Sequence, residues 1–184
     1  MALLPHIGAP PDRTVDNPDG NQDVIRFGNN ASAPNGMAFH SDGSLFVSDS
    51  FQGAIFQIEN ADICSGSCAV TTFVHDALLA TAGFPPFGAD GIAFDPSGHL
   101  WVASNQADEV VVLNGNGRAV AILGDFLGFR EDGAPRGLLF PASIVFSRDS
   151  AFVTNLALPL TPAVGDEPEE DVRVYTISRI KMGP

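Results

Sequence analysis

The sequence predicts an all-β protein built as a β-propeller, and three observations carry this prediction. A pattern of short strands recurs three times along the chain. Each copy joins its strands through polar turns rich in Gly, Asp and Ser. No stretch shows the apolar periodicity of a helix. Short strands in repeats of about 50 residues, with no helices between them, are typical of propeller blades.

The repeat is visible in three segments that align with one another. They read PNGMAFHSDGSLFVSDS at 34–50, ADGIAFDPSGHLWVASN at 89–105 and PASIVFSRDSAFVTN at 141–155. In each segment a short apolar strand is followed by a polar turn and then by an alternating strand. Gly and Asp in these turns supply the backbone conformations of tight hairpins. Each segment therefore predicts the two inner strands of a blade.

Outer strands follow these segments. A third strand is predicted at 54–58, 109–113 and 172–177, and a fourth at 69–74 and 119–123. The third copy lacks a fourth strand of its own, which leaves its outer edge unpaired.

One spare strand, DVIRF at 23–27, precedes the first copy and can supply the missing edge. With it the chain has three four-stranded blades inside a unit that spans 23–180. The blades cover about 34–74, 89–123 and 141–180. Residues 1–22 form an N-terminal extension.

Three blades are too few for a closed ring, because propellers have about four to eight. We therefore expect the chain either to be part of a longer protein or to form a homodimer in which two chains make one six-bladed ring. In the dimer, residues 23–27 complete the third blade of the other chain. Closure removes the exposed apolar blade faces and the unpaired strand edge that an open stack would keep.

The composition restricts the partners. Hydrophobic residues make up 45% of the 184, and no segment is long and apolar enough to span a membrane. The formal net charge is −13, from 9 basic and 22 acidic residues. Such a surface repels phosphate backbones and anionic lipids, so we expect no nucleic-acid or membrane partner. The chain is expected to be soluble. Residues 1–20 lack the features of a signal peptide, which leaves cytoplasmic and exported locations open.

Two cysteines, Cys64 and Cys68, lie in the segment CSGSC. A zinc site needs about four ligands with paired spacing, and no second Cys/His pair accompanies these two. A local disulfide and two free thiols remain equally open, and neither implies catalysis.

Alternating strand directions divide the predicted blades into two rims. The starts of the first strands and the ends of the second strands share one rim, together with the links between blades. Asn35 and Asp90 stand at the starts of first strands on this rim. Asp49, Ser104 and Asn155 stand at the ends of second strands and are candidate substrate-binding residues. The hairpin turns and the cysteine loop lie on the opposite rim.

Two long links, 75–88 and 124–140, also lie on the rim of Asn35 and Asp90. Long loops on a rigid scaffold are common binding elements. Their aromatic residues either wall a substrate pocket or only cap the apolar blade edges. These residues are Phe84, Phe87, Phe126 and Phe129. His75 is the histidine placed near this rim, and with no predicted partner it can equally be an ordinary loop residue.

Asn35 and Asp90 each precede a glycine, Gly36 or Gly91, which lets the backbone approach the channel axis. An amide oxygen and a carboxylate that converge there suit a hard cation such as Ca²⁺, which takes six to eight oxygen ligands. Asn-Gly and Asp-Gly are also common turn dipeptides, so the spacing alone leaves a purely structural role open.

These residues also carry a family resemblance. The segments PNGMAF, DSFQGAIFQI, FGADGIAFDPSGHLWVAS and FPASIVF resemble the SMP-30/gluconolactonase/LRE family over about residues 23–180. The resemblance implies the fold of a six-bladed propeller. It discriminates less well against NHL-repeat and strictosidine-synthase-like propellers, which share the blade pattern.

The family includes metal-dependent lactonases, in which the Asn of the PNG motif and the Asp of a later Asp-Gly motif hold one divalent ion in the channel. The resemblance carries these roles to Asn35 and Asp90 and to no other position. The resemblance implies a divalent ion, and the oxygen ligands make Ca²⁺ the leading candidate, with Zn²⁺, Mg²⁺ or Mn²⁺ as alternatives. The family's first half, with a glutamate ligand and a further asparagine, has no counterpart here, so the chain resembles the second half of such a propeller.

The leading functional hypothesis is a metal-dependent hydrolase of a lactone or related ester. The ion would polarise the carbonyl, and Asp90 would be both a ligand and the candidate catalytic base. The alternatives are a non-catalytic NHL-type propeller that binds a ligand or protein, and an inactive propeller fragment. A divalent metal that stays bound through extensive dialysis would favour the hydrolase.

Overall fold

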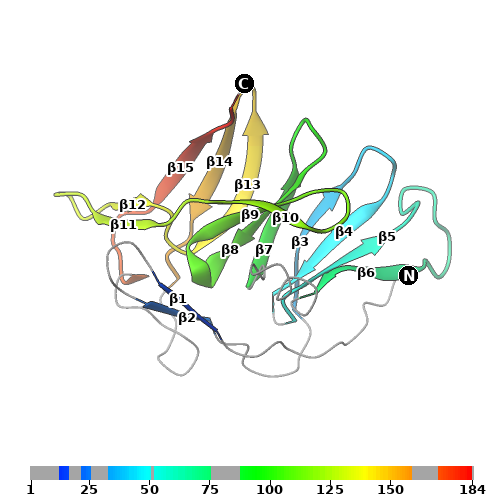
Figure 1. Cartoon of the computed structure of the whole chain (residues 1–184), viewed down its shortest axis with the longest axis horizontal. Coiled ribbons are helices and arrows are strands. Elements are labelled where there is room, and N and C mark those ends of the chain that lie inside the picture. The colour runs from blue at the N-terminus through cyan, green and yellow to red at the C-terminus, as the bar shows by residue number, and fades with distance from the viewer. Residues whose placement is uncertain are drawn as a thin grey trace.

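The computed structural model describes residues 13–16, 22–25, 33–50, 52–75, 88–158 and 170–183. These residues form an all-β structure, as the repeat predicts (Figure 1). Their one helical element is η1 (Asn105–Ala107), a single turn of 3-10 helix. None of the described residues belongs to a helix that is long and apolar enough to cross a membrane.

Two antiparallel sheets each consist of four consecutive strands. The first sheet contains β3 (Pro34–Phe39), β4 (Leu45–Asp49), β5 (Ala54–Ile58) and β6 (Val70–His75). The second sheet contains β7 (Ala89–Phe94), β8 (Leu100–Ser104), β9 (Glu109–Leu113) and β10 (Ala119–Leu123). Strand order in both sheets follows the sequence, as it does in a propeller blade.

The third sheet has three strands in the described part of the chain. They are β13 (Pro141–Ser147), β14 (Ser150–Asn155) and β15 (Thr176–Lys181). The sequence placed the last of these strands at 172–177, and the structure places it four residues later. Val172 is part of a different cluster, where it packs against Phe126 and Leu139, while Ile180 of β15 packs between the second and third sheets. Tertiary packing therefore sets the register of this strand.

Two short hairpins accompany the sheets. β1 (Arg13–Asp16) pairs with β2 (Gln22–Ile25), and β11 (Phe126–Phe129) pairs with β12 (Pro135–Gly137). The second hairpin lies in 124–140, which the sequence presented only as a link between blades. β2 contains the described part of 23–27, and its strand partner in this structure is β1. It also contacts η1, so this hairpin stands next to the ends of β7 and β8 (Figure 1).

The three sheets spread like a fan, with β3, β7 and β13 as their inner strands (Figure 1). β7 contacts β3 on one side and β13 on the other. This arrangement brings together strands that are about 50 residues apart in the sequence.

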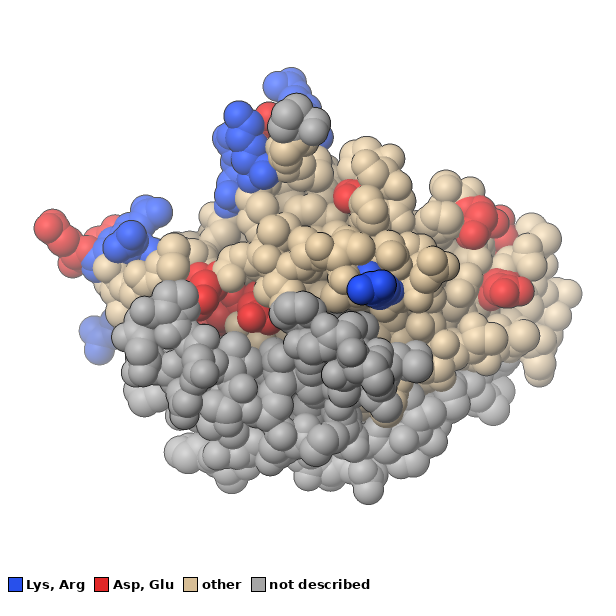
Figure 2. Space-filling model, viewed as in Figure 1, with Lys and Arg blue, Asp and Glu red and all other residues tan. Residues whose placement is uncertain are grey.

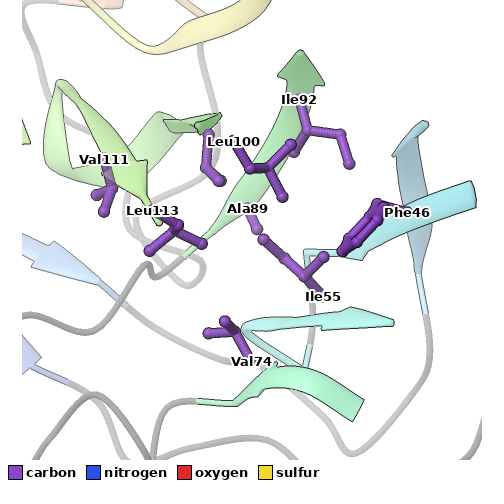
Figure 3. Packing of buried hydrophobic residues seen from close by; sticks show 9 residues of the cluster. Phe46, Ile55, Val74, Ala89, Ile92, Leu100, Val111 and Leu113 are labelled. Atoms are coloured by element: carbon purple, nitrogen blue, oxygen red, sulfur yellow. The ribbon is translucent and has the colours of Figure 1, made fainter. Parts of the chain in front are cut away.

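Buried side chains fill the space between the first and second sheets (Figure 3). Phe46, Ile55 and Val74 come from the first sheet. The second sheet contributes Ala89, Ile92, Leu100, Val102, Val111 and Leu113. The rings of Phe46 and Phe94 meet edge to face at 5.1 Å, a favourable arrangement for aromatic pairs.

The second and third sheets enclose a similar layer. Trp101, Val110 and Val112 of the second sheet face Ile144, Phe146, Ala151 and Val153 of the third. Here Trp101 and Phe146 make the edge-to-face contact, at 5.1 Å. The repeat therefore preserves the packing between sheets as well as the strand pattern.

Each inner strand carries a β-bulge at the same place in the repeat. The pairing shifts register between Pro34 and Met37, between Ala89 and Ile92, and between Pro141 and Ile144. A bulge turns the side chains of the extra residues away from the regular sheet, and bulges often occur next to functional sites.

Gly36 and Gly91 lie in the first two bulges, where the inner strands approach most closely. A Cβ atom on Gly36 would lie 2.8 Å from the Cα of Gly91, and a Cβ on Gly91 would lie 2.8 Å from the Cα of Ser143. These are backbone atoms that cannot rotate away. Only glycine therefore permits this spacing between neighbouring inner strands.

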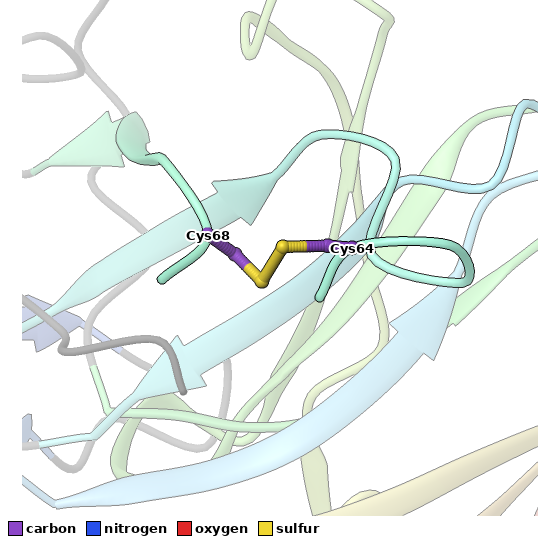
Figure 4. The surroundings of a disulfide bond; sticks show 2 residues. All are labelled: Cys64 and Cys68. Carbon is purple, nitrogen blue, oxygen red and sulfur yellow. A yellow bond between two sulfur atoms is a disulfide. The ribbon is translucent and has the colours of Figure 1, made fainter. Parts of the chain in front are cut away.

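Cys64 and Cys68 form a disulfide in the connection between β5 and β6 (Figure 4). Of the two states that the sequence left open, the structure has the bonded one. The pairing of Leu45 with Ile58 places this connection at the Phe39 end of the first sheet, opposite the end that carries Asn35.

We predict that Gly36→Ala destabilises the protein by about 1–3 kcal/mol, because the new methyl group forces β3 and β7 apart. Gly115→Ala is the matched control, since Gly115 lies in the turn between β9 and β10 with nothing within 4 Å of an added Cβ. Both variants lose the same glycine flexibility in the unfolded chain, so their difference isolates the strand contact. Equal midpoints in urea denaturation would contradict the prediction.

Candidate functional site

The first two bulges place Asn35 and Asp90 side by side at one end of the inner strands. The Asn35 amide donates a hydrogen bond to the Asp90 carboxylate and another to the hydroxyl of Ser50, at 3.2 Å. A second amide, that of Asn105, lies with its Nδ2 3.5 Å from Oδ2 of Asp90. The pair that the sequence singled out thus meets in the structure, and Asn105 joins it.

Asn105 was not among the residues predicted from the sequence. It is the first residue of η1 and follows directly after β8, just as Ser50 follows β4. The sequence feature that could have indicated Asn105 is therefore a polar residue immediately after the second strand in each of the first two copies. Its approach to Asp90 depends on the turn of 3-10 helix, which no repeat alignment shows.

Two hydroxyl groups of the first sheet hold the backbone around Asp90. Ser48 accepts a hydrogen bond from the N–H of Gly36 at 2.8 Å and donates one to the carbonyl of Asp90 at 2.6 Å. Ser50 donates to the carbonyl of Ala89 at 2.7 Å. These bonds join β3 and β4 to β7, so the position of the Asp90 side chain is fixed by two sheets.

Partial burial raises the pKa of Asp90 to about 6. Hydrogen bonds from Asn105, Asn35 and the N–H of Gly91 act in the opposite direction but only in part offset the lost solvation. A carboxylate with incomplete solvation gains more from a bound cation than a fully exposed one does. A pKa displaced by burial in this way is also typical of functional carboxylates.

The donor set around Asp90 consists of oxygen atoms: one carboxylate and the amide oxygens of Asn35 and Asn105. No group of three His, Cys, Asp or Glu residues gathers in the described part of the chain. These donors fit a hard cation such as Ca²⁺ or Mg²⁺ and not a zinc site of His and Cys. An ion would replace the amide N–H donors, so both amides would turn their oxygens toward it.

The residues predicted at the ends of the second strands are buried within the protein. Asp49 is buried, and its carboxylate accepts hydrogen bonds from the N–H groups of Ala33 and Gln52 and from the Gln52 side chain. Ser104 is likewise fully buried. Both residues stand at the predicted end of their strand, but below the surface on which Asn35 is exposed.

Asn155, the third residue of this set, has a well-defined internal role. Its side-chain oxygen accepts a hydrogen bond from the N–H of Leu139 at 3.1 Å, and its Nδ2 donates to the hydroxyl of Thr176 at 2.8 Å. It therefore ties the segment before β13 to the start of β15. In the described structure its contacts are with the protein itself.

His75 and the aromatic candidates are separated from Asp90. His75 is the last residue of β6, the outermost strand of the first sheet, where its Nε2 is buried with no hydrogen-bond partner among the described residues. Phe126 is buried against Leu139, and its ring meets that of the half-exposed Phe129 at 5.1 Å. These two phenylalanines pack the β11–β12 hairpin. Phe84 and Phe87 lie outside the described residues.

The raised pKa of Asp90 predicts a specific pH dependence of stability. A folded pKa of about 6 against an ordinary value of 3.8 means that the folded state binds this proton more readily. The resulting stabilisation is fully present below pH 3.8 and is lost as the pH rises through about 6. In chelator-treated buffer, the free energy of unfolding of the native chain should therefore fall relative to that of Asp90→Asn between about pH 4 and 7. A difference that does not change with pH would contradict the burial effect.

Comparison with a protein-family model and with solved structures agrees with this architecture. No curated protein matches the chain. Among solved structures, a luciferin-regenerating enzyme is similar with a TM-score of 0.60 and 17% identity, over 92% of this chain and 51% of that one. A gluconolactonase from Xanthomonas campestris has a TM-score of 0.58 and 16% identity, over 96% of this chain and 55% of its own.

The chain thus spans about half the length of these structures, and at such identities they establish the β-propeller fold. The family model for the SMP-30/gluconolactonase/LRE-like region matches residues 14–123, which include both Asn35 and Asp90. That match covers more than half of the sequence. The chain belongs to the SMP-30/gluconolactonase/LRE-like family.

Proposed function

We propose that this chain carries the ion-binding residues of a divalent-cation-dependent hydrolase that acts on a lactone or related ester. The observation that carries the proposal is the Asp90 carboxylate, half-buried between two sheets, beside two amides and with a pKa raised to about 6. Membership of the family and the similarity to a gluconolactonase support the reaction class.

Ca²⁺ is the proposed ion, with Mg²⁺ or Mn²⁺ next and Zn²⁺ last, because every donor at the site is an oxygen. When bound, such an ion polarises a lactone carbonyl and lowers the pKa of a bound water. Asp90 would supply the negative charge that holds the cation. Asn35 and Asn105 would direct neutral oxygens at it and limit the access of bulk water from their side.

Asp90 is also the candidate general base. A base works best when its pKa is near the working pH, because it is then ionised and still accepts a proton readily. Burial brings Asp90 toward that range from the ordinary value of 3.8. The bonds of Ser48 and Ser50 to the backbone on either side hold the carboxylate in place for this role.

A non-catalytic binding propeller is the second candidate function. It is favoured by the internal use of Asp49, Ser104 and Asn155, which leaves few polar side chains of the described residues facing a substrate beside Asp90. The carboxylate and the two amides of the site supply at most four oxygens, fewer than the six to eight that Ca²⁺ takes, so water or other segments must complete its shell.

Removal of the Asp90 charge should weaken Ca²⁺ binding at least tenfold, equivalent to about 1.4 kcal/mol, whereas Asn35→Ala should cost less because its amide is neutral. Asp42→Asn is the control for Asp90→Asn, since Asp42 is an exposed carboxylate in the turn at the other end of β3. Calorimetric titration of chelator-treated protein measures the affinities. Equal affinity in Asp90→Asn and Asp42→Asn would reject Asp90 as a ligand.

Lactone hydrolysis tests the reaction itself. We expect Ca²⁺-dependent release of acid from simple lactones, measured with a pH indicator, and its loss in Asp90→Asn. The double variant with Cys64→Ser and Cys68→Ser should keep both ion binding and hydrolysis, because the disulfide lies at the opposite end of the first sheet. Tight Ca²⁺ binding with no hydrolysis of any lactone would favour the binding propeller.

A further inference from the structure

The packing between sheets follows one rule in the described structure. Ile92 and Phe94 of β7 pack toward the first sheet, and Ile144 and Phe146 of β13 pack toward the second. An inner strand therefore uses these two positions to bury apolar side chains against the sheet that precedes it.

The equivalent residues of β3 are Met37 and Phe39, and both are exposed. Met37 pairs with Val47 as Ile92 pairs with Val102, and Phe39 pairs with Leu45 as Phe94 pairs with Leu100. Their exposed fractions are 66% and 58%, whereas that of Ile92 is 6%. The first sheet thus presents half of an inter-sheet contact to solvent, which we term the leading face.

The other half of the same contact is exposed on the third sheet. Strand pairing makes Ile177 equivalent to Ile55 and Val110, since these three pair with Thr154, Ser48 and Ala103. Ile55 and Val110 are fully buried against the following sheet, but Ile177 is 67% exposed.

Val145 behaves in the same way. It pairs with Phe152 as Ala38 pairs with Phe46, and Ala38 is packed between the first and second sheets. Val145 is 62% exposed. We term the surface of Val145 and Ile177 the trailing face.

Charge distinguishes the two faces. The sequence has no Lys or Arg from 27 to 117, so the first sheet has only acidic charges, among them Asp42, Glu59 and Asp62. Four of the nine basic residues lie on or beside the third sheet: Arg148, Arg173, Arg179 and Lys181. Figure 2 shows basic atoms near the C terminus, acidic atoms over the right of the view, and both kinds together at the far left, where the β11–β12 hairpin lies. Arg179 shares the side of β15 that carries Ile177, so the trailing face has a basic group and the first sheet offers acidic ones.

The repeat also predicts one ion pair across such a contact. A small cavity between the first and second sheets is lined by Gln57 on one side and Asn114 on the other. Arg179 is the third-sheet equivalent of Gln57, because it pairs with Phe152 as Gln57 pairs with Phe46. Glu59 follows β5 as Asn114 follows β9. In a repeated contact, Arg179 would therefore face Glu59.

We propose that the trailing face of one chain packs on the leading face of a second copy, with Arg179 opposite Glu59 of that copy. Each chain has one leading and one trailing face. Two chains related by a two-fold axis therefore bury both leading faces and both trailing faces and close a ring. This chain spans about half the length of the similar propellers. The contact runs along β3 and the turn end of the first sheet, since Val47 and Ile58 further out are already buried.

The assembly also bears on the ion site, although the inference does not depend on the proposed function. Inner strands line the centre of a propeller, so closure brings the Asn35 and Asp90 of both copies to one channel. Oxygen donors from the second copy would then be available to an ion that the described donors of one chain leave under-coordinated.

Sedimentation equilibrium of the full chain tests the proposal, and twice the mass of one chain is expected. Val145→Glu should raise the dimer dissociation constant at least tenfold. Val120→Glu is the matched control, because Val120 is a similarly exposed valine (54%) on β10, away from both faces. Fluorescence of the single tryptophan, Trp101, which is buried between the second and third sheets, verifies that each variant is folded. A monomer, an open-ended series of larger assemblies, or equal effects of the two substitutions would overturn the proposal.

Charge reversal tests the register of the contact. Arg179→Glu and Glu59→Arg should each weaken the dimer, because each puts like charges opposite one another. The two changes combined in one chain should restore association, since every contact then pairs Glu at 179 with Arg at 59. Restored dimerisation supports the register, and a double variant that is weaker than either single variant contradicts it. Both residues are exposed, so the folded state of one chain should tolerate all three variants.

Discussion

The close approach of neighbouring inner strands is the constraint on which the rest of this structure depends. Gly36 lets β3 pass directly over the backbone of β7, and Gly91 lets β7 pass over β13. A side chain at either position would meet backbone atoms and force the sheets apart. Because the strands are in contact, Ser48 can bond to both of them, and apolar side chains of neighbouring sheets pack against one another. The bulges at the same positions then turn Asn35 and Asp90 toward each other.

This geometry also explains the electrostatics of the site. The carboxylate of Asp90 lies where two sheets and a turn of 3-10 helix meet, so it loses part of its solvation and its pKa rises. Neutral amides donate hydrogen bonds to the Asp90 carboxylate and replace part of its lost solvation. Among the hydrogen bonds of the described residues, none joins this carboxylate to a cationic side chain. The net charge of −13 favours the approach of cations to the chain as a whole. A cation is therefore the ligand that we propose for this site.

The packing between sheets occurs twice in the described structure and is not continued on the two outer faces of the fan. Sheets one and two each bury their following face, while Ile177 and Val145 of the third sheet stay exposed. Met37 and Phe39 are likewise exposed, on the side of the first sheet where a preceding sheet would pack. Exposed apolar groups at positions that are buried elsewhere in one repeat indicate a missing neighbour more specifically than surface hydrophobicity does. Arg179 on the third sheet and the acidic residues of the first sheet support the second copy that we propose as the partner of both faces.

The sequence by itself determined the β-propeller fold, most of the strands and the pairing of Asn35 with Asp90, because all three depend on local patterns that repeat at a constant spacing. It also indicated the family through the same segments. The β11–β12 hairpin, the four-residue displacement of β15 and the approach of Asn105 were decided only by tertiary contacts. Val172, for example, has strand-like neighbours but is held by Phe126, a residue far from it in the sequence. Strand direction predicts which end of the sheet Asp49, Ser104 and Asn155 occupy, but only the tertiary structure decides whether other segments cover them.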